Sequence, residues 1–338
     1  MRPRWPWLVV LPLALSIVVV AVASTIRRPA LGAAAAVLGP VPIPADNPPT
    51  PDKVALGKLL FFDRRLSGSN TIACATCHQP GKGLSDGLPR SIGASGEMPR
   101  NATSLWNVAY MRTIHSDGSR VSLEDQADKA IPGPAMAQAY PALLAELGTV
   151  PEYRQRFERA FADGITEANV AKAIAAYERT LLAFRSPFDR YRAGDKAALT
   201  AEQKAGMRLF FGPRTGCSSC HVAPLFTDNQ FHNLGVPQVG PKPVDNGRFD
   251  VSHNPADQGT FKTLTLRNVG RSAPYMHDGA FTTLDQVVAF YIGGGGPAPN
   301  KSPLIRPLDL TAKEQRQLVA FLESLTDPVA RVSPPRLP

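Results

Sequence analysis

Two short stretches of the chain carry cysteine and histidine at a spacing that can fix a cofactor covalently. In each, two residues separate two cysteines, and a histidine directly follows the second cysteine. The motifs consist of Cys74, Cys77 and His78 and of Cys217, Cys220 and His221. This pattern is typical of haem c attachment, in which the thiols add to the porphyrin vinyl groups and the histidine becomes an axial ligand of the iron. One such motif alone is also compatible with a redox dithiol or half of a zinc site.

The N-terminus indicates that the rest of the chain is exported. Arg2 and Arg4 precede a long apolar stretch, and the Ala-Val-Ala sequence at 21–23 fits a signal-peptide cleavage site. We therefore expect a signal peptide at 1–23 and a periplasmic protein. The alternative is an uncleaved N-terminal anchor, because the apolar stretch approaches membrane-spanning length. All four cysteines lie in the two motifs, so none is left for a disulfide, and two covalently bound haem c groups are favoured.

Composition indicates a globular protein without a nucleic-acid partner. The 338 residues are 43% hydrophobic and 19% charged, with a formal net charge of +9. Such a chain can bury a core and is long enough for two domains. Because Lys and Arg are spread out and form no basic run, we expect no nucleic-acid binding. Membrane contact is expected only if the N-terminal segment stays uncleaved.

The elements that position the two motifs are also repeated. "LGKLLFFDRRLSGSNTIACATCH" parallels "AGMRLFFGPRTGCSSCH", and each predicts a short helix that ends in Leu-Phe-Phe and runs toward its motif. Pro51 after Thr50 starts the first helix, and a capping box of Thr200 and Gln203 starts the second. The repetition predicts two related haem domains.

The fold is predicted to be mainly α, with two cytochrome c-like haem domains and long connecting loops. Further helices are expected at 166–184, 283–291 and 311–325, and no segment shows convincing strand alternation. Proline- and glycine-rich loops are expected between the helices. The predicted parts are a linker at 24–49, an N-terminal haem c domain at 50–190, a C-terminal haem c domain at 195–327 and a tail at 328–338.

Several blocks, in order over about residues 50–326, resemble the bacterial di-haem cytochrome c peroxidases and their relative MauG, which oxidises a precursor protein to build a quinone cofactor. They include "GKLLFFDRRLSGSNTIACATCH", "PRNATSLWN", "DGSRVSLEDQA", "CSSCHVAPLFTDNQFHNLGV" and "FKTLTLRNVGRSAPYMHDGAFTTLDQVVAFY". The resemblance implies an N-terminal haem that reacts with hydrogen peroxide and a C-terminal haem that stores or relays an electron. The reductant would be a small periplasmic redox protein or an oxidisable partner protein.

The sixth ligands of the two irons distinguish the branches of this family. The resemblance places Tyr291 where family peroxidases ligate haem 2 with methionine and MauG uses tyrosine. A phenolate stabilises oxidised iron, whereas a thioether raises the potential. Tyr291 could instead be a core aromatic residue, with Met276 as a rival ligand. For haem 1, the loop at 79–104 lacks the histidine that many family peroxidases have, so an open iron is expected unless Met98 closes it.

Two family residues for turnover are missing. Ser116 stands where the family has a tryptophan between the haems, and Trp106 or Tyr110 could substitute for it. The stretch "IPGPAMAQAY" lacks the glutamate that assists cleavage of the peroxide O–O bond, a step where acid–base help is normally large. His115 is the nearest candidate replacement, or it is a hydrogen-bonded structural residue.

The resemblance also implies a calcium ion bound by Asn101, Ser272 and Pro274, since oxygen ligands suit calcium. Asn101 could equally be an ordinary loop residue. We expect His277 and Asp278 to support the fold, and His232 and His253 to be solvated. The favoured function is MauG-like oxidation of a partner protein. The alternatives are a cytochrome c peroxidase and a non-enzymatic electron-transfer or sensing cytochrome.

Overall fold

The computed structural model describes Met1 and residues 38–240, 244–328 and 330–338. The expected signal peptide, its cleavage site and most of the linker therefore lie outside the described residues. The chain divides into two compact units, 1–30 and 31–338, and the second is described below. Within the described ranges, no helix is long and apolar enough to cross a membrane.

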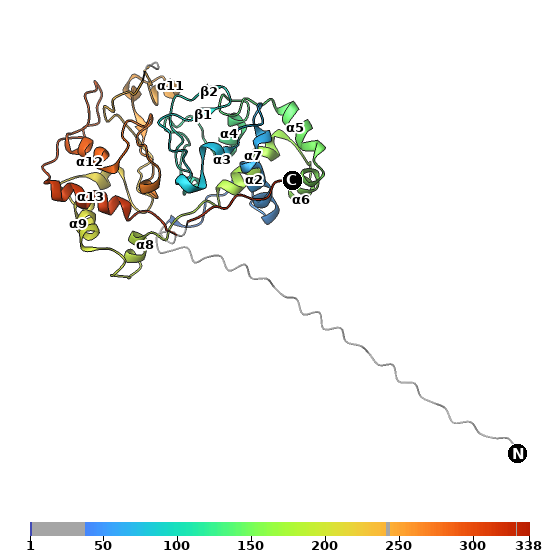
Figure 1. Cartoon of the computed structure of the whole chain (residues 1–338), viewed down its shortest axis with the longest axis horizontal. Helices are drawn as coiled ribbons and strands as arrows, with labels where there is room; N and C mark the ends of the chain where they lie inside the picture. Colours follow the sequence, from blue (N-terminus) through green and yellow to red (C-terminus); the bar gives the residue numbers. More distant parts are fainter. Residues whose placement is uncertain (2–37, 241–243, 329) are drawn as a thin grey trace. The chain divides into compact units, whose positions relative to one another are not determined.

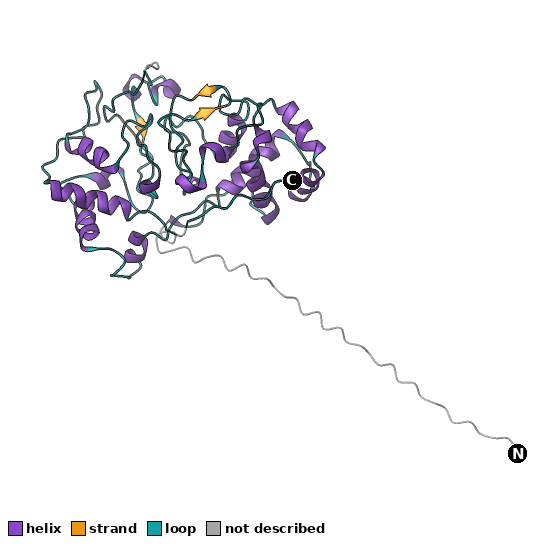
Figure 2. Cartoon of the chain, viewed as in Figure 1, coloured by secondary structure: helices purple, strands orange, loops and turns teal. Residues whose placement is uncertain are grey.

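The second unit is mainly helical, as expected, with little sheet (Figures 1 and 2). Its α-helices are α2 (Pro51–Phe62), α3 (Cys74–Cys77), α4 (Leu123–Ala130), α5 (Tyr140–Thr149), α6 (Pro151–Ala160), α7 (Glu167–Glu178), α8 (Pro187–Arg192), α9 (Ala201–Phe211), α10 (Cys217–Cys220), α11 (Phe249–Ser252), α12 (Leu284–Ile292) and α13 (Ala312–Glu323). The strands form two antiparallel pairs, β1 (Ile92–Gly93) with β2 (Gly96–Glu97) and β3 (Phe231–His232) with β4 (Phe261–Lys262). Strands of two residues are too short to show the alternation of apolar and polar residues by which a strand is predicted from sequence.

The predicted helix starts are confirmed. Thr200, Thr283 and Thr311 each form a capping box, and Thr50 accepts a hydrogen bond from the backbone N–H three residues later. The helix predicted at 166–184 ends earlier, at Glu178.

Asn107 explains the early end of α7. Its side chain accepts a hydrogen bond from the Ala183 N–H (2.9 Å) and donates one to the Ala183 carbonyl (3.2 Å). Its backbone N–H donates to the Leu181 carbonyl (2.8 Å). Residues 181–183 therefore pair with Asn107 rather than continue the helix.

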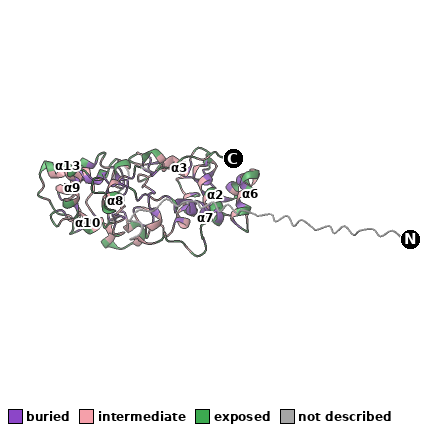
Figure 3. Ribbon diagram, turned by 90° about the horizontal axis from the view of Figure 1, so that it is seen from below, coloured by how far each residue is buried: buried purple, intermediate pink, exposed green. Residues whose placement is uncertain are grey.

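The same helix pair occurs once in each half of the unit. In the first half α2 packs on α7, with buried residues gathered around them (Figure 3). In the second half α9 packs on α13. Each contact is made at a glycine: a Cβ on Gly57 would lie 1.8 Å from the Ala173 carbonyl oxygen, and one on Gly206 would lie 1.8 Å from the Gln317 carbonyl oxygen. The helix backbones thus meet at a distance that excludes any side chain.

Replacing Gly206 by alanine should therefore destabilise the protein by about 1–3 kcal/mol or more, because the clash is with backbone and no rotamer change relieves it. Gly57→Ala should behave alike. Gly148→Ala is the control, since a Cβ there meets nothing within 4 Å and alanine favours a helix. Urea denaturation followed by far-UV circular dichroism measures all three variants. Equal midpoints for Gly206→Ala and Gly148→Ala would contradict the close approach.

A second segment is also repeated. Asn107 and Asn268 both adopt a left-handed conformation before a short 3-10 helix, Val108–Tyr110 or Val269–Arg271. An antiparallel bridge follows in each half, Ile114 with Arg120 and Tyr275 with Phe281. A helix capped by Ser122 or Thr283 comes next, α4 or α12. Counted from the first residues of these helices, Leu123 and Leu284, Tyr291 on α12 corresponds to Ala130 on α4.

Arg100 ties the two halves together. Its guanidinium binds Asp245 through two hydrogen bonds of 2.6 and 2.7 Å, and Asp117 through one of 2.5 Å. All three side chains are largely buried. Because both carboxylates are partly buried and bind the same guanidinium, these charge-assisted hydrogen bonds stabilise the protein more than an exposed ion pair does.

Candidate functional site

The first motif presents its histidine in a fixed orientation. Cys74–Cys77 form the short helix α3, and His78 directly follows it. The His78 Nδ1 lies 3.0 Å from the carbonyl oxygen of Leu84. Since a carbonyl can only accept, Nδ1 carries the proton and Nε2 is left as the free lone pair. An imidazole oriented in this way is suited to bind a metal through Nε2.

The second motif repeats this geometry. Cys217–Cys220 form α10, and the His221 Nδ1 lies 3.0 Å from the carbonyl oxygen of Phe226. Burial lowers the pKa of both histidines, so each imidazole is held neutral, the form that ligates metals.

The thiols are poorly suited to redox or zinc chemistry. Burial raises the pKa of Cys74 to about 12 and those of Cys77 and Cys220 to about 11. A reactive dithiol needs a lowered pKa. In the described ranges, the only cluster of metal-ligating side chains comprises Cys220, Asp228 and His232, which does not include the motif histidine. A neutral thioether, as in haem c, carries no such burial penalty.

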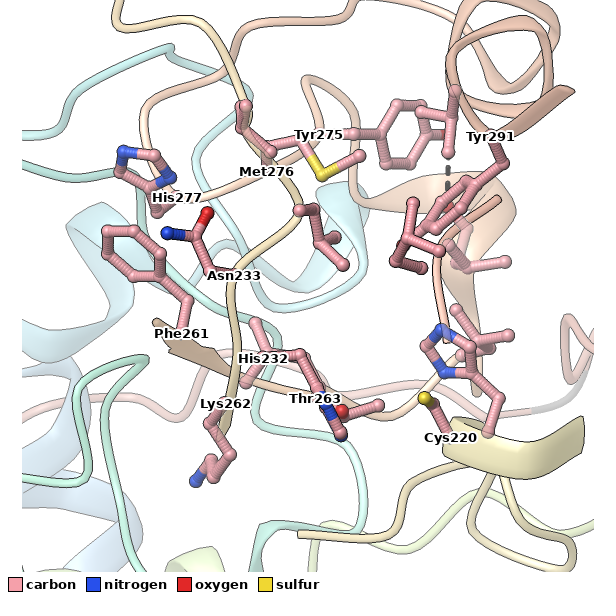
Figure 4. Close-up of a pocket in the computed structure, with 18 of the residues that line it drawn as sticks. Cys220, His232, Asn233, Phe261, Lys262, Thr263, Tyr275, Met276, His277 and Tyr291 are labelled. Carbon is pink, nitrogen blue, oxygen red and sulfur yellow. Dashed lines mark hydrogen bonds between the residues drawn. The ribbon is translucent and has the colours of Figure 1, made fainter. Parts of the chain in front are cut away.

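A cavity of about 620 Å³ contains the second motif. Its walls are mostly apolar and include Cys217, Cys220 and His221. Tyr291 lies across this cavity from Cys220 (Figure 4). A cavity of this size, mostly apolar with a few polar groups, is typical of cofactor sites. The residues therefore fit a haem, which α10 would hold through its cysteines and for which Tyr291 on α12 would be a candidate ligand.

Both rival ligands for haem 2 line this cavity. Burial is the main cause that raises the pKa of the Tyr291 phenol, and Cys217 and Cys220 contribute. Met276 also lines the cavity, in a left-handed backbone conformation, with its carbonyl held by the Asn101 side chain at 2.8 Å. Position and chemistry thus make both residues candidates.

The first half has no counterpart of the tyrosine at the position that corresponds to Tyr291. Ala130, the counterpart of Tyr291, has no group that can ligate iron. Met98, the other candidate ligand for haem 1, follows β2 in the β1–β2 hairpin, next to Gly93.

His115 lies in the same 620 Å³ cavity, as the counterpart of Met276, with a left-handed backbone. Its Nδ1 is 3.0 Å from the Ser119 hydroxyl. Burial is the main cause that lowers its pKa to about 4, with Arg120 and Arg100 contributing. The ring is therefore neutral at pH 7, and its pKa lies far from the value that suits an acid or base at that pH.

Ser116, the position at which the family has its bridging tryptophan, is buried, and its carbonyl accepts a hydrogen bond from the Lys262 backbone N–H at 2.7 Å. The buried Lys262 ammonium donates to the Thr113 carbonyl. A lysine from β4 thus lies against this segment of the first half. Of the two proposed substitutes, Trp106 lines the cavity, whereas Tyr110 donates to the Gly39 carbonyl at 3.2 Å and lies outside it.

Two of the three expected calcium ligands are in contact. Asn101 Nδ2 donates to the Pro274 carbonyl at 3.1 Å, and Ser272 lines the same cavity. A cation would need the Asn101 Oδ1 to face this position instead of Nδ2. The two amide atoms are interchangeable by a flip of the side chain, so the residues fit a cation once the amide is turned.

Of the remaining histidines, His277 stacks on Phe261 at 3.9 Å and is buried, as expected for a fold-supporting residue. The Asp278 carboxylate accepts the Val239 N–H at 2.7 Å. His253 is exposed. The prediction that His232 is solvated was wrong. His232 belongs to β3, which pairs with β4, and its Nε2 lies 2.9 Å from the Asp228 carboxylate.

Glu178 is a buried group that the sequence did not reveal. Its side chain is 4% exposed, one carboxyl oxygen has no partner among the described residues, and its charge acts on Cys74. Burial raises its pKa to about 8. The local sequence "AYERT" reads as the polar side of a helix, so only the packing of α7 could show this burial.

Glu178 should make the protein less stable as pH rises. From its ordinary value of 4.5 up to about 8, the folded state holds a proton that the unfolded state has released, so the unfolding free energy falls by at most about 1.4 kcal/mol per pH unit. Glu178→Gln should flatten this dependence, and the exposed Glu152→Gln should leave it unchanged. Guanidinium unfolding at pH 6 and pH 8 measures the effect. A wild-type slope retained in Glu178→Gln would contradict it.

Comparisons with known proteins agree with this site. The family model described as di-haem cytochrome c peroxidase matches residues 51–197. The chain is 42% identical over 335 residues to cytochrome-c peroxidase IdrP1 of Denitromonas iodatirespirans, covering 89% of each chain. It is 40% identical to the methylamine utilization protein MauG of Methylorubrum extorquens, covering 88% of this chain and 85% of that one.

Among solved structures, the chain is similar to a MauG-like protein associated with microbial copper homeostasis, with a TM-score of 0.81 and 34% identity over 88% of this chain and 95% of that one. These relatives are di-haem oxidoreductases, so two c-type haems are implied. With two haem motifs on a matching fold, this chain belongs to the di-haem cytochrome c peroxidase/MauG family of enzymes.

Proposed function

We propose that the protein is a periplasmic di-haem oxidoreductase that uses hydrogen peroxide to oxidise a partner protein, in the manner of MauG. The N-terminal haem domain (50–190) holds haem 1, and the C-terminal domain (195–327) holds haem 2. The attachment cysteines are Cys74 and Cys77 for haem 1 and Cys217 and Cys220 for haem 2. The iron ligands are His78 for haem 1 and His221 with Tyr291 for haem 2.

The observation that carries this proposal is the pair Ala130 and Tyr291. The two halves share attachment helix, histidine orientation and helix packing, yet the same position on the ligand-bearing helix is a methyl group in one half and a phenol in the other. A peroxide site needs an open coordination position, whereas a storage site does not. Ala130 leaves the face opposite His78 without a ligand from α4, and Tyr291 closes haem 2 with a hard anionic donor.

Residues of the chain hold the haem ligands, exclude water and assist proton transfer. The haems supply the redox chemistry when bound. The Leu84 and Phe226 carbonyls hold the two imidazoles, and the apolar wall of the cavity keeps water from the cofactor. His115 stays in the proposal as a candidate for proton transfer in its neutral form, and it lines the cavity of the second motif. A calcium ion on Asn101, Ser272 and Pro274 would join the two halves beside the Arg100 ion pairs.

Absorption and EPR spectra of the holoprotein, recorded before and after addition of peroxide, test the proposal. We expect one high-spin haem that changes at once and a second haem whose spectrum depends on Tyr291. Tyr291→Phe should alter haem 2 alone, and Met276→Leu, the matched control, should leave both haems unchanged. A methionine–iron absorption band that is lost in Met276→Leu would overturn the Tyr291 assignment.

The second candidate is a cytochrome c peroxidase that takes electrons from a small redox protein. Met276 in the haem 2 cavity favours it, because a thioether would raise the potential of that haem. Rapid catalytic peroxide consumption with a reduced carrier protein supports this candidate. No spectral response to peroxide would instead favour a non-enzymatic electron-transfer or sensing cytochrome.

A further inference from the structure

Trp106 borders two voids. Its side chain is 5% exposed, and it lines both the cavity that Tyr291 also lines and a groove of about 590 Å³. It belongs to the hydrophobic cluster of Phe61, against which Cys74 of the first motif packs. Within the described residues, its indole Nε1 has no hydrogen-bond partner. One oxidisable side chain therefore touches the surroundings of both haem sites and an outward-facing groove.

The groove is basic. It lies between α2, the residues after α7 and the segment 330–333. Lys58, Arg185 and Arg331 line it, no aspartate or glutamate does, and none of the three pairs with a carboxylate of the described chain. Exposed charges of one sign attract partners of the opposite sign and accelerate their association. The groove thus suits a protein with an acidic surface.

The repeat shows why this groove is open. Arg267 is the counterpart of Trp106, since each directly precedes the left-handed asparagine of its half. In the second half, α8 covers this position, and its Asp189 binds Arg267 at 2.6 Å with both side chains buried. No helix in the described part of the first half takes the place of α8. In the first half the segment 330–333 packs at this position instead, and a groove remains between it and α2. Trp106 thus lines a groove where the second half has a closed ion pair.

Tyr177 is the rival relay, because it also lines the groove and packs on Phe61 at 5.2 Å. Its hydroxyl is buried and has no partner among the described residues. A tyrosine must release its phenol proton when it is oxidised at neutral pH, and among the described residues the Tyr177 hydroxyl has no hydrogen-bond partner to receive it. An indole can lose an electron and keep its proton, so Trp106 is the better relay.

We propose that Trp106 passes electrons, one at a time, from an acidic redox protein docked in the basic groove toward the haems. This rests on the proposed reaction with peroxide. Each donor molecule loses one electron to oxidised Trp106, which is thereby restored. Two donor electrons and two protons convert one hydrogen peroxide molecule to two water molecules.

The sequence allows a direct test of Trp106. The chain has three tryptophans, and the other two, Trp5 and Trp7, lie in the expected signal peptide. Holoprotein is treated with peroxide without a donor, and its peptides are analysed by mass spectrometry. EPR is recorded with natural and with ring-deuterated tryptophan. We expect oxygen addition at Trp106, protection by neutral hydroquinone, and a radical signal that narrows on deuteration. An unmodified Trp106 in protein that consumes peroxide overturns the relay.

A kinetic test addresses the groove, with reduced plastocyanin, an acidic blue-copper protein, as the probe. The rate at which the holoprotein oxidises plastocyanin with peroxide should decrease as the salt concentration rises. The same rate should be at least about tenfold lower in the triple variant Lys58→Glu/Arg185→Glu/Arg331→Glu. Trp106→Phe should lower the plastocyanin rate far more than the hydroquinone rate, and Tyr177→Phe should change neither. The matched charge control is Arg192→Glu/Lys313→Glu/Arg316→Glu, at exposed positions outside the groove.

The outcomes separate this inference from the proposed function. If wild-type holoprotein oxidises hydroquinone with peroxide but both charge triples behave alike and Trp106→Phe keeps its plastocyanin rate, the relay and its groove are wrong and the proposed function stands. If wild-type protein reacts with peroxide under neither condition, both fail.

Discussion

His78→Gly is expected to lose the reaction with peroxide and to regain it with added imidazole, while His221→Gly keeps its first reaction with peroxide. The reason is the asymmetry on which the proposed function rests: Ala130 on α4 corresponds to Tyr291 on α12, so we assign a sixth ligand to haem 2 and none to haem 1. Removal of His78 takes away the only ligand that we assign to the reactive iron. Imidazole can fill the space because the Leu84 carbonyl that orients the ring remains.

Stopped-flow absorbance after addition of peroxide measures the effect, and protein mass shows that both haems stay attached through their cysteines. A His78→Gly protein that reacts as fast as wild type, or a His221→Gly protein that alone loses the reaction, would falsify the assignment of haem 1 as the peroxide site. Lack of imidazole rescue in protein with both haems attached would count against the role of His78 as ligand.

Asp189→Ala is expected to destabilise the protein by about 3–5 kcal/mol, the largest effect on stability that we expect, because it leaves the Arg267 guanidinium buried and unpaired. The side chains of the pair are 2% and 1% exposed. Asp189 also accepts hydrogen bonds from the Ser186 backbone and hydroxyl at 2.9 and 2.7 Å, which start α8. The substitution therefore removes a helix cap as well as a charge partner.

The control is Asp195→Ala, whose partner Arg190 is half exposed at 3.7 Å. A surface pair of this kind contributes about 0–1 kcal/mol. The double variant Asp189→Leu/Arg267→Met should recover most of the loss, since no buried charge is left unpaired. Chemical denaturation of the holoproteins gives the three values. Equal losses for Asp189→Ala and Asp195→Ala would contradict the buried pair.

What the sequence could predict was local. The predicted helix caps formed as expected. In each, a threonine hydroxyl bonds to the backbone of the residue three positions later, as Thr200 does with Gln203. The helix itself fixes the distance between these partners, so the sequence alone predicts the cap. The helices α5 and α6 were not predicted, and both begin without a side-chain cap bond. The helix α4 carries a readable start signal, Ser122 as its N-cap.

The features that decide the site depend on packing between distant segments. The burial of Glu178 and the shared lining of Trp106 arise only when α7 meets α2 and the loop before Val108. The equivalence of Ala130 and Tyr291 shows in the backbone conformations that repeat before them, and the pairs Asn107-Val108 and Asp117-Gly118, which recur as Asn268-Val269 and Asp278-Gly279, were a readable signal for it. Tyr291 itself was predicted as the ligand of haem 2 by resemblance, and the structure adds its position across the cavity from Cys220.

The buried thiols have a consequence for biogenesis. Thioether formation requires a cysteine sulfur that an assembly enzyme can reach, and in the folded protein burial raises the pKa of Cys74 to about 12 and that of Cys220 to about 11. Such thiols are almost wholly protonated at neutral pH. We therefore expect the porphyrins to be attached before the fold closes around them.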